Sequence, residues 1–237
     1  MNTANSIDPS DDPAHFVAKW RADWPEWAIA EVFLPTVMRA RVDAWQALQF
    51  ELLDAAWGGA DPRPGEAKLG WWMDELHGWS LGRRRHPLGS ALQRGSAGWG
   101  AMAATIPALQ ASRRRPADGG DAWSTLHPVA AAAAVIEGDL FAMPSGPADL
   151  TAGWLHARLA RHPDSAVPQA LIDADGPEAS TFAWMRALCE YWPRTTGAGR
   201  YRRLANSLAR ARLMRGEAAR PLHAGTTLLT CWRAARD

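Results

Sequence analysis

Apolar residues recur at the three- and four-residue spacing of helices along most of the chain, and no run shows the alternation typical of strands. The strongest helix spans residues 36–57, and its apolar stripe consists of Val42, Trp45, Leu48, Leu52 and Ala56. In residues 66–79 the apolar face consists of Leu69, Trp72, Met73 and Leu76. The same pattern predicts further helices over 13–24, within 25–35, from residue 86 onward with interruptions by glycine, and over 121–142, 148–161, 177–192, 200–215 and 221–236.

The segments between these helices are short and polar. Residues 58–65 are predicted to form a loop and residues 112–120 a polar connection. No break is large enough for a domain boundary, and no long repeat recurs. We therefore predict an all-α fold, a single-domain multi-helix bundle over residues 13–237 that follows a flexible N-terminus over residues 1–12. Helices 36–57 and 66–79 should be adjacent and antiparallel, with Trp72 and Leu76 buried.

Composition narrows the class of protein. The 237 residues are 47% hydrophobic and 22% charged, as in ordinary globular proteins. The formal net charge of +1 gives no reason to expect a nucleic acid partner. No apolar run is long enough for a transmembrane segment, and the first residues do not resemble a signal peptide, so we expect a cytoplasmic protein. The 14 tryptophans should pack between helices or line a pocket.

Several kinds of chemistry lack their usual motifs. The 7 histidines and 2 cysteines show no zinc-ligand spacing. The sequence leaves the redox state of Cys189 and Cys231 open. The chain has neither a phosphate-binding loop ending in Gly-Lys-Ser/Thr nor a Gly-x-Ser-x-Gly elbow. Nucleotide hydrolysis and serine-based hydrolysis are therefore disfavoured.

Three segments between residues 30 and 95 form a recognisable series. The first contains Phe33-Leu34-Pro35, Arg39 and residues 44–54. The second is residues 69–76, LGWWMDEL, and the third is residues 85–88, RHPL. In this order they resemble the squalene/phytoene synthase family of head-to-head prenyl transferases, as a short divergent member. Residues 138–141 and 220–222 are similar only to the more divergent members of that family.

The resemblance implies a terpenoid-synthase-like bundle of helices around an apolar cavity. Active members hold two prenyl diphosphates there through magnesium ions, which are bound by two Asp-x-x-x-Asp motifs. Such a leaving group needs cations to neutralise its developing charge, and an apolar aromatic wall shelters the carbocation from water. The candidate substrate-binding residues on this basis are Arg39, Trp45, Phe50, Trp72, Arg84 and Arg85.

The acidic residues do not supply these two motifs. The one Asp-x-x-x-Asp match, Asp8 with Asp12, lies in a polar terminus, and we interpret it as chance. At the place of the first motif the chain has Glu51 and Asp54 on one helix face, which fits either a reduced magnesium site or a solvated helix edge. For the second motif, residues 142–175 contain no acidic pair at helical spacing.

Other charged clusters allow a structural and a functional interpretation. Of Asp74 and Glu75, one should be exposed while the other pairs with arginine or caps a neighbouring element. Residues 83–85 (RRR) form either a solvated loop or a contact for a diphosphate or an anionic lipid, and residues 113–115 are similar. Residues 200–215 predict a helix with a basic face. Such a helix either lies on the protein surface or contacts an acidic membrane.

We interpret the chain as a degenerate squalene/phytoene synthase-like protein without ordinary prenyl transferase activity. It would serve as a scaffold that binds an isoprenoid or another lipid, or as an assembly helper for a protein partner, in peripheral contact with the inner membrane. The alternative is a transferase that acts on isoprenoid diphosphates through Glu51 and Asp54, with Mg²⁺ as its cofactor. A third hypothesis is an unrelated helical adaptor whose tryptophans fill a core. A pocket lined by Trp45, Phe50, Trp71 or Trp72, with Glu51 and Asp54 at its rim, would favour ligand binding. Tightly packed indoles without a cavity of ligand size would favour the adaptor.

Overall fold

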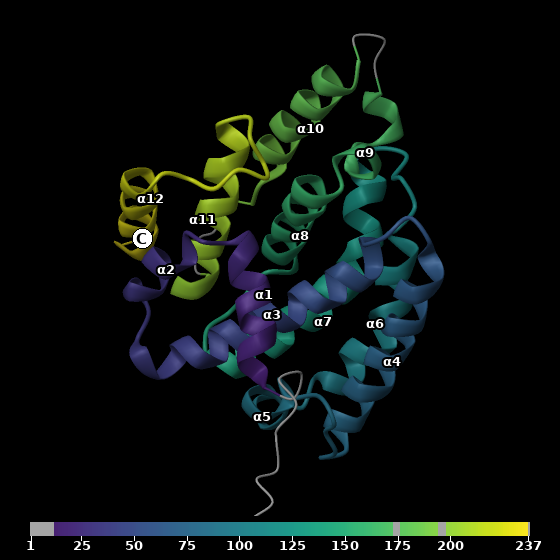
Figure 1. Cartoon of the computed structure of the whole chain (residues 1–237), viewed down its shortest axis with the longest axis vertical. Helices are drawn as coiled ribbons and strands as arrows, with labels where there is room; N and C mark the ends of the chain where they lie inside the picture. Colours follow the sequence, from purple (N-terminus) through teal and green to yellow (C-terminus); the bar gives the residue numbers. More distant parts are fainter. Residues whose placement is uncertain (1–11, 173–175, 194–197, 237) are drawn as a thin grey trace, which may run out of the picture.

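The computed structural model describes residues 12–172, 176–193 and 198–236, and this part of the chain is all-α (Figure 1). Twelve α-helices lie within the described residues: α1 (Pro13–Asp23), α2 (Trp27–Ala30), α3 (Thr36–Trp57), α4 (Pro62–Ser80), α5 (Gly89–Leu92), α6 (Trp99–Ala111), α7 (Gly119–Phe141), α8 (Pro147–Arg161), α9 (Pro163–Ala166), α10 (Pro177–Tyr191), α11 (Arg200–Met214) and α12 (Ala224–Arg236). Short 3-10 helices are η2 (Glu31–Phe33), η3 (Gln93–Gly95) and η4 (Gln169–Leu171). Residues 1–11 of the predicted flexible N-terminus, with Asp8, lie outside the described residues.

Local signals determine where most of these helices begin. The side chain of Asp12 caps α1 by accepting a hydrogen bond from the backbone N–H of Ala14, as the Asp-Pro pair predicts. The predicted loop over 58–65 is wrong for its second half. Asp61 caps α4 in the same way, and Pro62 occupies the first turn, where no backbone N–H is needed. The helix expected from residue 86 with interruptions by glycine is divided into α5, η3 and α6, with η3 ending at Gly95 and Gly98 preceding α6.

Helix α3 crosses the middle of the bundle and contacts α1, α4 and α8 (Figure 1). Five further contacts join helices in series: α4 packs on α6, α6 on α7, α7 on α8, α8 on α11, and α11 on α12. Lys68 of α4 meets Glu51 of α3, while Gly65 lies against the carbonyl of Ala55. Because later residues of α4 meet earlier residues of α3, the two helices are antiparallel, which confirms the expectation.

Tryptophans form much of the core between α3, α4 and α6. The rings of Trp45, Trp99, Trp79 and Trp72 make successive edge-to-face contacts, and all four are buried. The predicted burial of Trp72 and Leu76 is therefore confirmed. The predicted inward position of Met73 is wrong, since 38% of this residue is exposed.

The basic face predicted for residues 200–215 is only partly on the surface. Arg202 and Arg212 of α11 are buried, and each forms an ion pair with a buried glutamate. Arg202 pairs with Glu137 of α7, whereas Arg212 pairs with Glu26, which precedes α2. Two of the arginines therefore connect α11 to the rest of the bundle rather than facing solvent.

Candidate functional site

A cavity of about 290 Å³ lies between α1, α2, α3, α8 and α11. Its size is near the lower limit of about 300 Å³ for small-molecule sites. Aromatic, aliphatic and small side chains make up most of the wall, among them Trp20, Trp24, Phe50, Leu53, Ala157 and Ala160. Alanine and glycine on α8 and α11 leave room for the cavity, because they carry almost no side chain toward the aromatic groups of α1 and α3.

One wall of the cavity is polar and tightly connected. The side-chain oxygen of Gln49 accepts a hydrogen bond of 2.9 Å from the indole N–H of Trp154, and its amide group lies 3.5 Å from the Tyr201 hydroxyl. Arg202 donates to that hydroxyl as well as to Glu137, which also accepts from Trp45. These bonds hold the wall in one arrangement, because each buried donor has a defined acceptor.

Among the buried side chains on the wall, His156 and Asn206 have polar atoms without a hydrogen-bond partner in the described part of the chain. The Nε2 atom of His156 lies 3.1 Å from the carbonyl of Ala218, but its Nδ1 atom has no hydrogen-bond partner. Burial, together with the nearby Arg212, lowers the pKa of His156 to about 3, so its imidazole is neutral at ordinary pH. The amide nitrogen of Asn206 donates to Asp149 while its oxygen has no partner. The cavity therefore offers both an acceptor oxygen and a neutral imidazole nitrogen.

Arg161, at the C-terminal end of α8, is the unpaired cation of the site. Within the described residues its guanidinium forms no ion pair, its Nη1 atom is buried without a hydrogen-bond partner, and it lies 4.6 Å from the centre of the Phe50 ring. Burial lowers the pKa of this guanidinium, although the carboxylates of Asp23, Asp54 and Glu51 partly oppose that effect. The same side chain borders a second, polar hollow of about 410 Å³, beside His162 and Arg113. An anion that reaches Arg161 would supply the partner that this guanidinium lacks.

The predicted metal ligands Glu51 and Asp54 are paired with ammonium groups. Lys19 of α1 lies 3.0 Å from Glu51 and 3.3 Å from Asp54, and Lys68 of α4 lies 2.7 Å from Glu51 and 3.7 Å from Asp54. Lys19 and Lys68 are the only lysines of the chain. Lys19 also lies 5.2 Å from the centre of the Phe50 ring, so this lysine–carboxylate cluster adjoins the cavity wall.

The lysine–carboxylate cluster balances two positive charges with two negative ones. Burial alone would raise the pKa of Glu51, but the hydrogen bonds and charges of Lys68 and Lys19 outweigh it, and this pKa lies below its ordinary value. Burial likewise opposes the charge of Lys19, yet Glu51 and Asp54 raise its pKa overall. Among the described residues, no three His, Cys, Asp or Glu side chains come together as a metal site. A magnesium ion would have to displace both ammonium groups to bind here.

The other candidate substrate-binding residues lie in different surroundings. Phe50 lines the cavity, whereas Trp45 and Trp72 are buried in the tryptophan core. Arg39 donates to the carbonyls of Leu34 and Val32 at the turn that precedes α3.

Arg84 and Arg85 lie on the loop between α4 and α5, where Arg85 stacks over Trp71 at 5.3 Å and is 61% exposed. Glu75, which is 1% exposed, accepts hydrogen bonds from Trp79 and from the backbone of Arg85 and His86. The expected division of roles between Asp74 and Glu75 is therefore confirmed: Asp74 is exposed and Glu75 holds the next loop.

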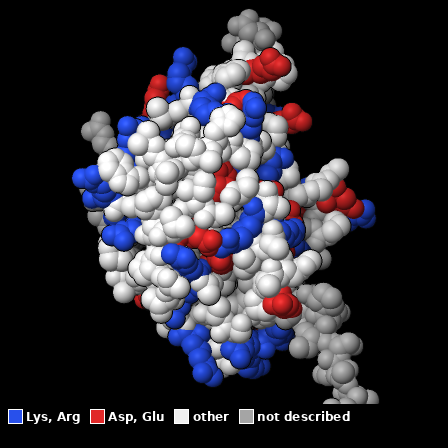
Figure 2. Space-filling model, turned by 60° about the vertical axis from the view of Figure 1, so that its left-hand side comes forward, with Lys and Arg blue, Asp and Glu red and all other residues white. Residues whose placement is uncertain are grey.

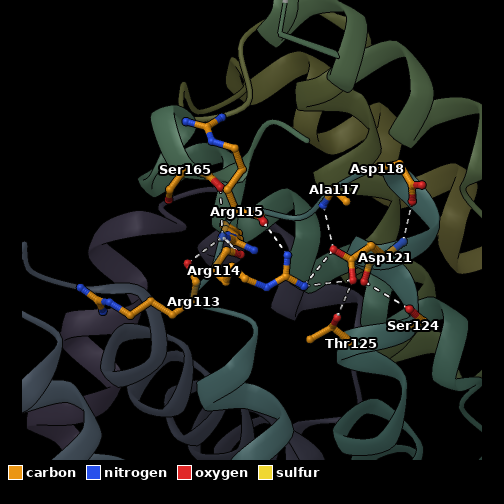
Figure 3. A network of polar contacts seen from close by, with 10 residues as sticks. Arg113, Arg114, Arg115, Ala117, Asp118, Asp121, Ser124, Thr125 and Ser165 are labelled. Atoms are coloured by element: carbon orange, nitrogen blue, oxygen red, sulfur yellow. Dashed lines mark hydrogen bonds and ion pairs between the residues drawn. The ribbon is translucent and has the colours of Figure 1, made fainter. Parts of the chain in front are cut away.

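Residues 113–115 act as structural contacts rather than as a free cationic loop. Arg113 donates to the carbonyls of Ala56, Gly58 and Gly59 at the C-terminal end of α3. Arg114 pairs with Asp121 in the first turn of α7, and Figure 3 shows Arg113 pointing away from that contact. Arg115 donates to the carbonyls of Val167 and Asp164. Three adjacent arginines thus connect three different parts of the bundle.

Sequence reasoning missed the polar residues that line the cavity. Gln49 lies four positions after Trp45 and one after Leu48, so a polar side chain beside the apolar stripe of residues 36–57 was the available signal. Nothing in the sequence distinguishes Arg161 from the other arginines, because only the folded chain shows which of them lack a partner.

Comparisons with protein-family models, curated proteins and solved structures find no match to this chain. Within the described residues, no helix is both long and apolar enough to cross a membrane.

Proposed function

We propose that this chain is a squalene/phytoene synthase-like protein that binds an isoprenoid or a similar lipid without catalysing head-to-head condensation. The observation that carries the proposal is the lysine–carboxylate cluster beside an aromatic cavity. In place of metal ions, the ammonium groups of Lys19 and Lys68 neutralise Glu51 and Asp54. The cavity can therefore hold an apolar chain, but the neighbouring carboxylates do not hold the metal ions that would activate a diphosphate leaving group.

The cavity suits an amphiphile with an anionic head. Trp20, Trp24 and Leu53 supply apolar surface for a hydrocarbon chain, which gains free energy by leaving water. Arg161 supplies the charge for a phosphate or carboxylate head. This guanidinium is partly buried and has no counter-ion among the described residues, so it gains a charge-assisted hydrogen bond when such a head arrives. The ligand class is therefore an acidic lipid in which Arg161 recognises the head and the aromatic wall holds the tail.

The first experiment is native mass spectrometry of the purified protein, which should show a co-purified lipid or isoprenoid. A fluorescence titration then compares farnesyl monophosphate, farnesyl diphosphate and farnesol in the presence of EDTA. We expect Arg161→Gln to weaken binding of the two phosphorylated ligands while farnesol binds as before. Arg94→Gln is the matched control, because Arg94 is an exposed arginine on η3 outside the cavity. Equal binding of all three ligands to wild type and Arg161→Gln would refute the role of Arg161.

Turnover separates this proposal from the transferase alternative. The wild-type protein, incubated with labelled farnesyl or geranylgeranyl diphosphate and Mg²⁺, should give no squalene or phytoene. A magnesium-dependent product that disappears in Glu51→Gln and Asp54→Asn would overturn the proposal in favour of the alternative. Failure of every ligand to bind would instead favour the helical adaptor.

A further inference from the structure

Helix α12 exposes apolar side chains along one face. Leu228, Leu229 and Trp232 are 52%, 46% and 47% exposed. The opposite face is buried against α11 and α2 through Thr227, Cys231 and Ala234. Packing against α11 and α2 therefore fixes the orientation of α12. The three large apolar groups face outward because of this packing, not because the end of the helix is frayed. Val32, which is 58% exposed, extends this surface onto η2, an element that also packs against α12.

The charged side chains that α12 itself exposes are arginines. Neither α11 nor α12 contains an acidic residue. Arg233 and Arg236 are exposed in the last turn of α12, and the Arg236 guanidinium lies 4.5 Å from the centre of the Trp232 ring. On the neighbouring elements, Glu26 is buried and paired with an arginine, as is the partly buried Glu31. The side that carries α12 comes forward in Figure 2, where much of the surface is uncharged and basic groups lie apart from one another with some acidic groups between them.

We propose that α12 docks the protein onto the surface of an anionic lipid bilayer. Leu228, Leu229 and Trp232 would enter the boundary between headgroups and acyl chains, while Arg233 and Arg236 contact lipid phosphates. An exposed helix face that combines leucine, tryptophan and arginine matches the chemistry of interfacial helices, in which apolar burial and attraction to anionic lipids add together. The long arginine side chains can keep their charges at headgroup level while their stems cover apolar surface.

A second copy of the chain is the rival occupant. In a two-fold contact through α12, Arg233 and Arg236 of both copies would approach one another without a carboxylate on either helix. One face of a 13-residue helix is also small compared with the roughly 800 Å² that each partner buries in a standard interface. An anionic bilayer satisfies the arginines and is not limited in area, so it fits this surface better.

The test is co-sedimentation of the full chain with phosphatidylcholine vesicles that contain either no phosphatidylglycerol or a large fraction of it. Wild type should bind the anionic vesicles, dissociate from them at high salt, and not bind neutral vesicles. Leu228→Gln/Leu229→Gln should weaken binding by about tenfold or more, because two apolar side chains no longer leave water. Arg233→Gln/Arg236→Gln should weaken it about thirtyfold, since each basic group near such a surface contributes roughly fivefold.

Two control variants locate the effect. Arg63→Gln/Arg94→Gln removes the same charge from exposed positions on α4 and η3, with α4 lying away from α12 in Figure 1, and Val135→Gln removes an exposed apolar group from α7. Both should bind vesicles as wild type does, and circular dichroism should show all variants folded. The proposal is overturned if wild type does not bind anionic vesicles, if the α12 variants bind normally, or if Arg63→Gln/Arg94→Gln abolishes binding.

Light scattering addresses the rival occupant. A dimer that dissociates on Trp232→Gln would assign the face to a second copy and refute the bilayer proposal, whereas a monomer supports it. The test does not use the cavity, so failure of lipid binding there leaves this result unaffected.

Discussion

Removing the guanidinium of Arg202 should destabilise the protein strongly. Glu137 is fully buried, and its carboxylate accepts hydrogen bonds from Trp45 at 2.7 Å and from Arg202. In Arg202→Met the indole N–H remains as a partner, but the charge of Glu137 is left uncompensated. Breaking a buried ion pair on one side costs about 3–5 kcal/mol of the free energy of unfolding.

A second substitution isolates the electrostatic part of this cost. In Arg202→Met/Glu137→Gln both charges are absent, and the amide oxygen of Gln can still accept the hydrogen bond from Trp45. The double variant should therefore be more stable than Arg202→Met alone, with a coupling energy of about 2 kcal/mol or more between the two sites. This recovery is expected because an uncharged buried pair avoids most of the desolvation penalty.

Urea unfolding followed by far-ultraviolet circular dichroism measures these differences. Arg200→Met is the matched control, because Arg200 lies on the same helix, is exposed, and forms no ion pair within the described residues. It should change stability by less than about 0.5 kcal/mol. A loss below about 1 kcal/mol for Arg202→Met, or simple additivity in the double variant, would contradict the assignment of a buried ion pair.

Three further predictions follow from the same structure. Trp72→Ala should cost about 3–5 kcal/mol in urea melts, because the ring is buried among aromatic neighbours, and a loss under about 1 kcal/mol would place it elsewhere. Burial lowers the pKa of His86 from 6.5 to about 4, so as the pH falls through this window the unfolded chain takes up a proton that the folded protein does not. Stability should fall by up to about 1.4 kcal/mol per pH unit from this group, and His86→Phe should show a shallower decline; equal slopes would refute the assignment. Mg²⁺ should leave the melting temperature of wild type unchanged but raise that of Lys19→Met/Lys68→Met, in which Glu51 has lost its ammonium partners. A rise in wild type would argue for a competent metal site.

Much of the architecture was predictable from local patterns. The bounds of α3 agree with the prediction, and those of α7, α8, α10 and α11 differ by at most two residues. Apolar periodicity and caps depend on residues that are close in sequence, so they can be read without the fold. The start of α4 was predicted too late for the same reason. Residues 58–65 contain both loop signals and an Asp-Pro helix start, and the helix begins at Pro62 with Asp61 as its cap.

The candidate site was less predictable, because its character depends on partners that are distant in sequence. Glu51 and Asp54 fit either a magnesium site or a solvated helix edge in the sequence. In the fold they pair with Lys19 and Lys68, which lie 32 and 17 residues from Glu51. Similarly, Arg202 and Arg212 look like surface charges until Glu137 and Glu26 are placed beside them.

The sequence alone therefore determined an all-α chain, the positions of its main helices and the absence of two Asp-x-x-x-Asp motifs on predicted helices. Only the tertiary structure decided which charges are neutralised, that Arg161 borders the cavity without a counter-ion in the described part of the chain, and that α12 turns leucine and tryptophan outward. The physical reason is the distance along the chain over which each interaction acts. Helix formation is governed by residues within about one turn of each other, whereas burial and charge pairing depend on which distant surfaces meet.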